Sequence, residues 1–171
     1  MKLSRRVWIS SSVLSIVLLG ATTVLAQNPT LPTDHLTGLW RLNLGKSKFD
    51  PANMAPQKDQ ARVNVTQAGI KVQTDGVNAD GKATHSEYTA KFDGKDYPWT
   101  GTVDGKPNTD QDAVSWKQID EWNYEVTNKL KGKTISTMHI VISKDGKTGT
   151  GTVTGTGPGG QAVKHTAVYE K

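Results

Sequence analysis

The sequence predicts an all-β fold: an antiparallel up-and-down meander of about 8 to 10 strands closed into a barrel. Three observations lead to this prediction: short segments with alternating apolar and polar residues, clusters of turn residues between them, and no segment with convincing helical periodicity. A two-layer sandwich fits the strand spacing as well. The closed meander is favoured because hairpins, and not long crossovers, join consecutive strands, and because a barrel has no exposed sheet edge.

The first 26 residues are typical of an export signal peptide. A basic start is followed by an apolar run, Val13–Ala26, that ends in small residues resembling a cleavage site. We expect cleavage after Ala26 and a protein exported to the periplasm or the medium, with no membrane contact afterwards. An uncleaved membrane anchor is the alternative, because the stretch Val7–Ala26 is just long enough to span a bilayer. Arg5 and Arg6 also resemble a twin-arginine motif, so the general and twin-arginine export routes both stay open.

Charge and cysteine content exclude several classes of site. The chain has 21 Lys and Arg and 16 Asp and Glu residues, but three of the basic residues lie in the predicted signal. The remaining balance leaves no basic stripe, so no nucleic-acid partner is expected. The chain has no cysteine, which excludes disulfides, thiolate metal sites and cysteine nucleophiles. The four histidines have no local metal-ligand spacing, so we expect no metal and no cofactor. We also expect the protein to be a monomer.

The rest of the chain divides into a lead-in and one domain. Residues 27–35, QNPTLPTDH, are polar and proline-rich, and we expect them to be a flexible lead-in. Residues 36–171 are expected to form a single β-barrel domain, with the first strand near Gly38–Leu44 and the last near Ala162–Glu170. Residues 47–62 are long enough for a helix, but their two prolines predict a loop.

Alternation is clearest in residues 122–130, WNYEVTNKL, where Trp122, Tyr124 and Val126 share one face and polar residues occupy the other. Residues 83–92, ATHSEYTAKF, likewise place Tyr88 and Phe92 on one face. This period of two is the mark of half-buried antiparallel strands.

Turn residues predict where these strands are joined. The tripeptide Asp-Gly-Lys occurs four times, starting at residues 80, 93, 104 and 145. Asp-Gly pairs favour two-residue hairpin loops in which both residues take positive φ angles, so each copy is expected to be a corner. Residues 148–156 alternate threonine with mostly glycine. They predict a strand with one nearly bare face, against which a backbone or a large aromatic residue packs closely.

The start of the domain, LTGLWRLNLGKSKFD, carries a resemblance to known proteins. Gly38-Leu39-Trp40 is similar to the Gly-x-Trp signature that opens the first strand of lipocalins, and the wider segment resembles the start of fatty-acid-binding proteins. Both are calycin barrels. The G-x-W-x-L-N…K-S-K-F opening and the Asp-Gly-Lys hairpins also resemble uncharacterised lipocalin-like proteins exported by bacteria.

The resemblance implies a lipocalin-like barrel over nearly the whole mature chain. It implies a structural role for Gly38 and Trp40, with the indole closing one end of the barrel. Lipocalins usually place an arginine of the last strand over this tryptophan, whereas here that strand offers Lys164. The two helices and the arginine–tyrosine clamp of fatty-acid-binding proteins are not visible, so the ligand residues of either family are not carried over.

The large side chains indicate where a ligand would bind. Leucine is scarce after residue 44, and aromatic residues share faces with threonine and serine, so the interior is either a lined cavity or a filled core. For the cavity, we expect a small, mostly apolar ligand bound without catalysis. The candidate lining residues are Tyr88, Phe92, Trp116, Tyr124, Val126 and His165.

Two other functions fit the same fold. A ligand-free structural or interaction module of the cell envelope would have a filled interior and an exposed aromatic patch around Tyr97 and Trp99. An enzyme would need an inward acid–base pair, such as His165 with a carboxylate. The adjacent acids Asp120 and Glu121 are expected to be a solvated hairpin corner and not a catalytic pair.

Overall fold

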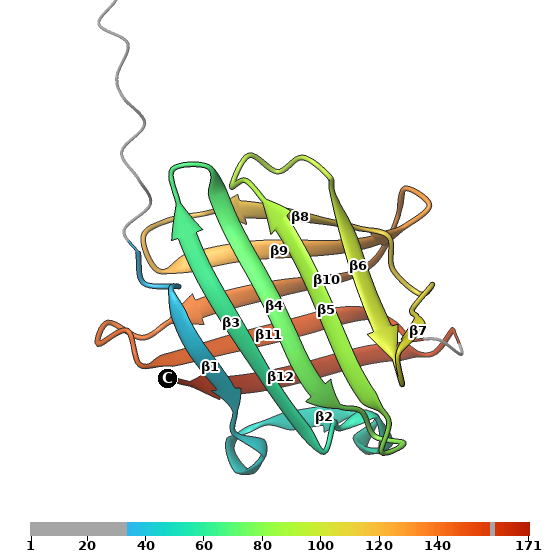
Figure 1. Cartoon of the computed structure of the whole chain (residues 1–171). Helices are drawn as coiled ribbons and strands as arrows, with labels where there is room; N and C mark the ends of the chain where they lie inside the picture. Colours follow the sequence, from blue (N-terminus) through green and yellow to red (C-terminus); the bar gives the residue numbers. More distant parts are fainter. Residues whose placement is uncertain (1–33, 158–159) are drawn as a thin grey trace, which may run out of the picture. The chain divides into compact units, whose positions relative to one another are not determined.

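Figure 1 shows the computed structural model, which describes residues 34–157 and 160–171. The regular secondary structure of the described residues is all β-strand except for two short 3-10 turns, η1 (Leu44–Lys46) and η2 (Ala52–Met54). The strands are β1 (Gly38–Leu42), β2 (Lys48–Asp50), β3 (Lys58–Thr66), β4 (Gly69–Val77), β5 (Ala83–Ala90), β6 (Tyr97–Val103), β7 (Lys106–Pro107), β8 (Ala113–Gln118), β9 (Asn123–Leu130), β10 (Lys133–Ile142), β11 (Thr148–Thr156) and β12 (Ala162–Glu170). The predicted signal peptide, 1–26, and most of the predicted lead-in, 27–35, lie outside the described residues.

The strands form one closed antiparallel meander, which confirms the predicted fold class. Ten of them follow the order β1-β3-β4-β5-β6-β8-β9-β10-β11-β12, and β12 pairs back onto β1. In Figure 1 the strands β3 to β6 cross in front of β9 to β12, as in a barrel seen from the side. The two remaining strands are additions to this wall: β7 pairs with β6, and β2 pairs with β12.

The free edge of β12 is covered by two short strands instead of one long one. β1 pairs with the last residues of β12, through Arg41↔Glu170 and Leu42↔Tyr169, and β2 pairs with residues 164–166. The turn η1 joins the two strands. Residues 47–62, predicted to be a loop, therefore contain β2, η2 and the start of β3, and the loop prediction is wrong for these strands. Both prolines lie outside the strands, where no ladder N–H is required.

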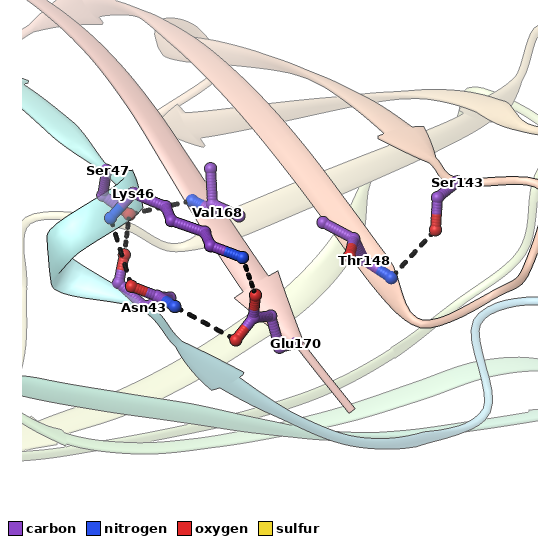
Figure 2. A network of polar contacts seen from close by, with 7 residues as sticks. All are labelled: Asn43, Lys46, Ser47, Ser143, Thr148, Val168 and Glu170. Carbon is purple, nitrogen blue, oxygen red and sulfur yellow. Dashed lines mark hydrogen bonds and ion pairs between the residues drawn. The ribbon is translucent and has the colours of Figure 1, made fainter.

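A polar network holds η1 against β12, and Figure 2 shows it. The side chains of Asn43 and Lys46 donate to the two carboxylate oxygens of Glu170, at 3.0 and 2.7 Å. Ser47 Oγ donates to the Asn43 carbonyl at 2.7 Å and accepts from the Val168 amide at 2.9 Å. The bonds from Lys46 and Asn43 hold the pKa of Glu170 below its usual value. We call these five residues the closure clamp.

The Asp-Gly corners are of two kinds. At Asp104-Gly105 both residues have positive φ, 48° and 72°, so the predicted two-residue turn is confirmed there. At the other three copies only the glycine has positive φ, and the prediction of a primed two-residue turn is wrong. The aspartates at 93 and 145 instead accept the amide two residues on, at 3.1 Å each, which builds the corner from a side chain. Lys131-Gly132 forms a further turn with two positive φ angles, 51° and 76°.

The bare face of β11 is confirmed. A Cβ added at Gly149 would lie 3.4 Å from the Trp40 ring and 3.2 Å from the Ile142 side chain. At Gly155 it would lie only 2.3 Å from the Ile135 carbonyl oxygen, on the neighbouring strand β10. Glycine on this strand therefore lets an aromatic ring and a second backbone approach closely.

We expect Ser47→Ala to lower the free energy of unfolding by about 1 to 2 kcal/mol, because the partly buried Val168 amide loses its acceptor. Ser86→Ala is the matched control: it is the same substitution on a barrel strand, and the described structure gives its hydroxyl no hydrogen bond. It should change stability by less than about 0.5 kcal/mol. Urea unfolding followed by tryptophan fluorescence measures both. Equal losses in the two variants would contradict a specific role for the clamp.

Candidate functional site

An apolar cavity of about 170 Å³ lies inside the barrel and is not fully enclosed. Aromatic and aliphatic side chains form most of its wall, and Gly149 and Gly151 of β11 contribute no side chain to it. Four polar side chains border it as well. The lining residues are Leu36, Trp40, Asp59, Ala61, Val63, Val72, Thr74, Tyr88, Trp116, Met138, Ile140, Ile142, Gly149, Gly151 and Tyr169. The sequence left a lined cavity and a filled core as alternatives, and the structure contains a cavity.

Trp40 is one of the most buried residues of the cavity wall, with 4% of its surface exposed. Its indole nitrogen donates to the Leu36 carbonyl at 2.7 Å, and its ring packs on Gly149. A cation lies over the ring: the ammonium of Lys171 is 4.6 Å from the ring centroid. Lys171 follows β12 directly, whereas Lys164, the basic residue that the sequence offered, is exposed on β12 opposite Asp50.

Gly38 explains how Lys171 reaches Trp40. Gly38 has a φ of +149°, and a Cβ at this position would lie 3.0 Å from the Lys171 side chain. Glycine therefore leaves room for the lysine stem, whose ammonium lies over the ring and donates to the His35 carbonyl at 2.9 Å. Partial burial lowers the pKa of Lys171. The Gly-x-Trp sequence thus has a physical role in the packing of this end of the domain.

A carboxylate–phenol pair is the most polar part of the cavity wall. The Tyr169 hydroxyl, from β12, donates to a carboxylate oxygen of Asp59, from β3. Burial raises the pKa of Asp59, and the Tyr169 bond offsets this only in part. Burial and the neighbouring Asp59 charge raise the pKa of Tyr169 well above its usual value. The pair also bridges β3 to β12 beside the short strand β1.

A second polar pair lies in the aromatic part of the wall. Trp116 Nε1 donates to the Tyr88 hydroxyl at 3.2 Å, and burial raises the pKa of Tyr88. Trp116 also packs edge-on against Phe92 and Tyr124, with ring centroids 6.0 and 6.4 Å apart. These rings form the part of the core next to the cavity.

The structure places the six predicted lining residues in three different surroundings. Tyr88 and Trp116 border the cavity. Phe92, Tyr124 and Val126 are not among the residues that border it, because they pack into the adjoining core with Trp116. His165 is not among them either. It lies against β2, where its Nδ1 accepts the Asp50 amide at 3.2 Å and its ring is 5.3 Å from the Phe49 ring.

Sequence reasoning missed Asp59 and Thr74 and did not rank Tyr169 as a lining residue. Asp59 was assigned to the predicted loop, although the alternation of Ala61 and Val63, continued back by two residues, would have placed it on the inner face. Tyr169 was on the inner face of the last strand by alternation. The sequence contains no signal that these two residues meet, because they are 110 positions apart.

Two other predicted features have clear positions. Tyr97 and Trp99 are half-buried and pack against the core, and the Trp99 ring covers Gly101. The corner predicted at Asp120 is confirmed: its carboxylate accepts the amides of Trp122 and Asn123 at 2.8 and 2.9 Å. The Asn123 side-chain amide, which donates to both carboxylate oxygens, and these backbone amides keep the pKa of Asp120 below its usual value.

Within residues 34–157 and 160–171, no three His, Asp or Glu side chains are grouped so that they could hold a metal ion. The helical segments of this range are too short to cross a membrane. Compared with protein-family profiles, with curated proteins and with solved structures, the chain gives no match. The function proposed below therefore rests on the cavity and its lining.

We expect the stability difference between the native protein and Asp59→Asn to depend on pH. The pKa of Asp59 is raised above 3.8 by folding, so its ionisation destabilises the folded state as the pH rises from about 4 through the folded pKa. Asparagine does not ionise, so the variant should become more stable relative to the native protein over this window. Urea unfolding at a series of pH values measures the difference.

Asp145→Asn serves as a control of opposite sign. A hydrogen bond from Ser143 lowers the pKa of Asp145, so this carboxylate stabilises the folded state above pH about 4 and the contribution is lost as the pH falls. This variant should therefore lose stability relative to the native protein as the pH rises. A pH-independent difference for Asp59→Asn would show that its carboxyl is not perturbed by folding.

Proposed function

We propose that the barrel binds a small, mostly apolar molecule in its interior and leaves it chemically unchanged. The single observation that carries the proposal is the apolar cavity of about 170 Å³. Protein interiors are close-packed, and voids larger than a water molecule are few. A ligand that fills this space would remove apolar surface of the wall from water, which stabilises the complex by roughly 25 cal/mol per Å² of apolar area buried.

The volume limits the size of the ligand. Apolar cavities of about 150 Å³ take up benzene, whereas sites for drug-sized molecules measure about 300 to 1,000 Å³. The ligand proposed here is therefore a single ring or an aliphatic molecule of similar bulk, and not a long-chain lipid. The rings of Trp40, Tyr88 and Trp116 give it flat apolar contact surfaces.

Binding without catalysis fits the polar groups of the wall. Asp59 bonds to Tyr169, and Tyr88 to Trp116. The Tyr88–Trp116 pair contains no base, and the raised pKa of Tyr169 disfavours the phenolate that a tyrosine nucleophile would need. His165, the best candidate base in the sequence, contacts the Asp50 backbone.

The proposal includes a lipocalin-like relationship and export. The relationship is supported by the Gly-x-Trp opening together with the lysine over Trp40, a cation in the place where lipocalins usually have arginine. Export is supported by the predicted signal in residues 1–26. A ligand-free structural module of the cell envelope is the alternative. Its expected mark, an exposed patch at Tyr97 and Trp99, is weakened because both side chains are half-buried.

Toluene tests this proposal on the mature protein. We expect saturable binding that raises the unfolding temperature and changes the fluorescence of Trp40 and Trp116, which border the cavity. Ala61→Leu, which fills part of the cavity, should weaken binding by about tenfold or more. Ala83→Leu is the matched control on the exposed outer face of β5 and should bind as the native protein does.

Absence of toluene binding by the native protein would sink the proposal. Equal binding by Ala61→Leu and the native protein would place the site elsewhere than in the cavity. Native mass spectrometry of protein isolated from its own host would show whether the barrel already carries a molecule of this size.

A further inference from the structure

We propose that the ligand is a small primary amine that carries one ring, with its ammonium group bound by Asp59, and not a carboxylic acid. This inference rests on the proposed function, because it assigns a chemical class to the molecule in the same cavity. It follows from which groups border the cavity, how Asp59 is held, and how the apolar walls are arranged.

The charge of the lining has one sign. Among the described residues that border the cavity, Asp59 supplies the one carboxyl group, and no lysine, arginine or histidine is with it. In a medium less polarisable than water, a single carboxylate strongly favours cations and hydrogen-bond donors and disfavours anions. Lys171 lies over Trp40 and donates to the His35 carbonyl, and it does not border the cavity. A ligand carboxylate would therefore meet repulsion without a compensating cation.

Asp59 keeps acceptor capacity for a ligand. An ionised carboxylate has about four acceptor sites, and the partners that the structure gives it are the Tyr169 hydroxyl and the Gln60 amide. Its Oδ1 atom lies over Gly76, where an added Cβ would be 2.9 Å from this oxygen and 3.0 Å from Thr84 Oγ1. The absence of a side chain at Gly76 thus leaves space for the carboxylate on the inner face.

A neutral phenol is a weak counterpart for a partly buried charge. Burial disfavours the ionised form of Asp59, and the Tyr169 bond does not cancel this effect. An ammonium group would supply both a positive charge and three donors. Charge-assisted bonds of this kind are roughly twice as strong as neutral ones.

The rest of the wall suits the body of such a molecule. The apolar volume accommodates one ring, and the rings of Tyr88 and Trp116 border it, where an aromatic face attracts a cation as well as a second ring. Thr74 borders the same space from β4 and offers a further hydroxyl for a second ammonium hydrogen. A ring with a short aminoalkyl group satisfies the apolar and the polar parts of the lining together.

Four probes with the same ring separate these contributions: toluene, benzyl alcohol, benzylamine and benzoate. Calorimetric titration of the mature protein at neutral pH should give benzylamine the lowest Kd and benzoate the highest, about tenfold or more apart. Asp59→Asn should weaken benzylamine by about tenfold or more and leave toluene within about twofold. Tyr169→Phe keeps the carboxylate and should keep the preference for benzylamine over benzoate.

The outcomes distinguish this inference from the function on which it depends. If toluene binds but benzoate binds as tightly as benzylamine, the assignment of an amine is overturned and binding of a small apolar molecule stands. The same holds if Asp59→Asn binds benzylamine unchanged. If none of the four probes binds, the proposed function fails and the inference fails with it. The comparison of the probes on the native protein needs no variant, so it decides the question even if a substitution prevents folding.

Discussion

Pairing of β12 with two strands at once is the constraint on which the interior of this barrel depends. β1 covers the end of β12 and β2 covers residues 164–166, and the closure clamp holds the turn between them. The clamp uses Asn43, Lys46 and Ser47, which belong to the same short stretch as Gly38 and Trp40. One segment of the chain therefore closes the sheet and places Trp40 in the wall of the cavity. Without that closure, β3 and β12 would not be held near each other, and the hydrogen bond between Asp59 and Tyr169 would not form.

Glycine residues on the inner face of the barrel let large neighbouring side chains lie directly against the backbone. Gly149 and Gly151 face the interior without side chains; Trp40 packs over the first, and Met138 lies 3.0 Å from the Cβ position of the second. Gly76 makes space in the same way for the Asp59 carboxylate. Larger side chains at these positions would fill the cavity or push its walls apart, at a cost of about 1 to 3 kcal/mol for overpacking. The repeated glycines of β11 are thus required by the large side chains, such as Trp40 and Met138, that pack directly on this strand.

Sequence reasoning predicted the fold and the inner faces of most strands, because both follow from local patterns of period two and from turn residues. It could not predict which inner side chains meet. Phe92 and Tyr124 share faces with Tyr88 and Val126, yet the offset between neighbouring strands places them in packed core and leaves Tyr88 at the cavity.

The wrong loop prediction for residues 47–62 has a similar origin. β2 has only three residues, and it forms because it pairs with β12, more than a hundred positions away. The local sequence shows mainly the two prolines that follow it, and these predict a loop. Lys171 was missed because it lies past the last strand, outside the pattern that located Lys164.

The architecture explains how a chain without disulfides tolerates an unfilled interior and a carboxylate on its wall. In a closed antiparallel sheet the backbone hydrogen bonds run around the wall, and they form regardless of what occupies the centre. Helix packing, by contrast, depends directly on side chains that fill the space between the elements. Here the ladder continues across the closure from β12 to β1 and β2, so the destabilising features can be confined to the interior. The aromatic cluster around Trp116 and the tight contacts of β11 fill the adjoining space. What is left open is a volume with one carboxylate at its wall, and the selectivity expected of it follows from that single charge.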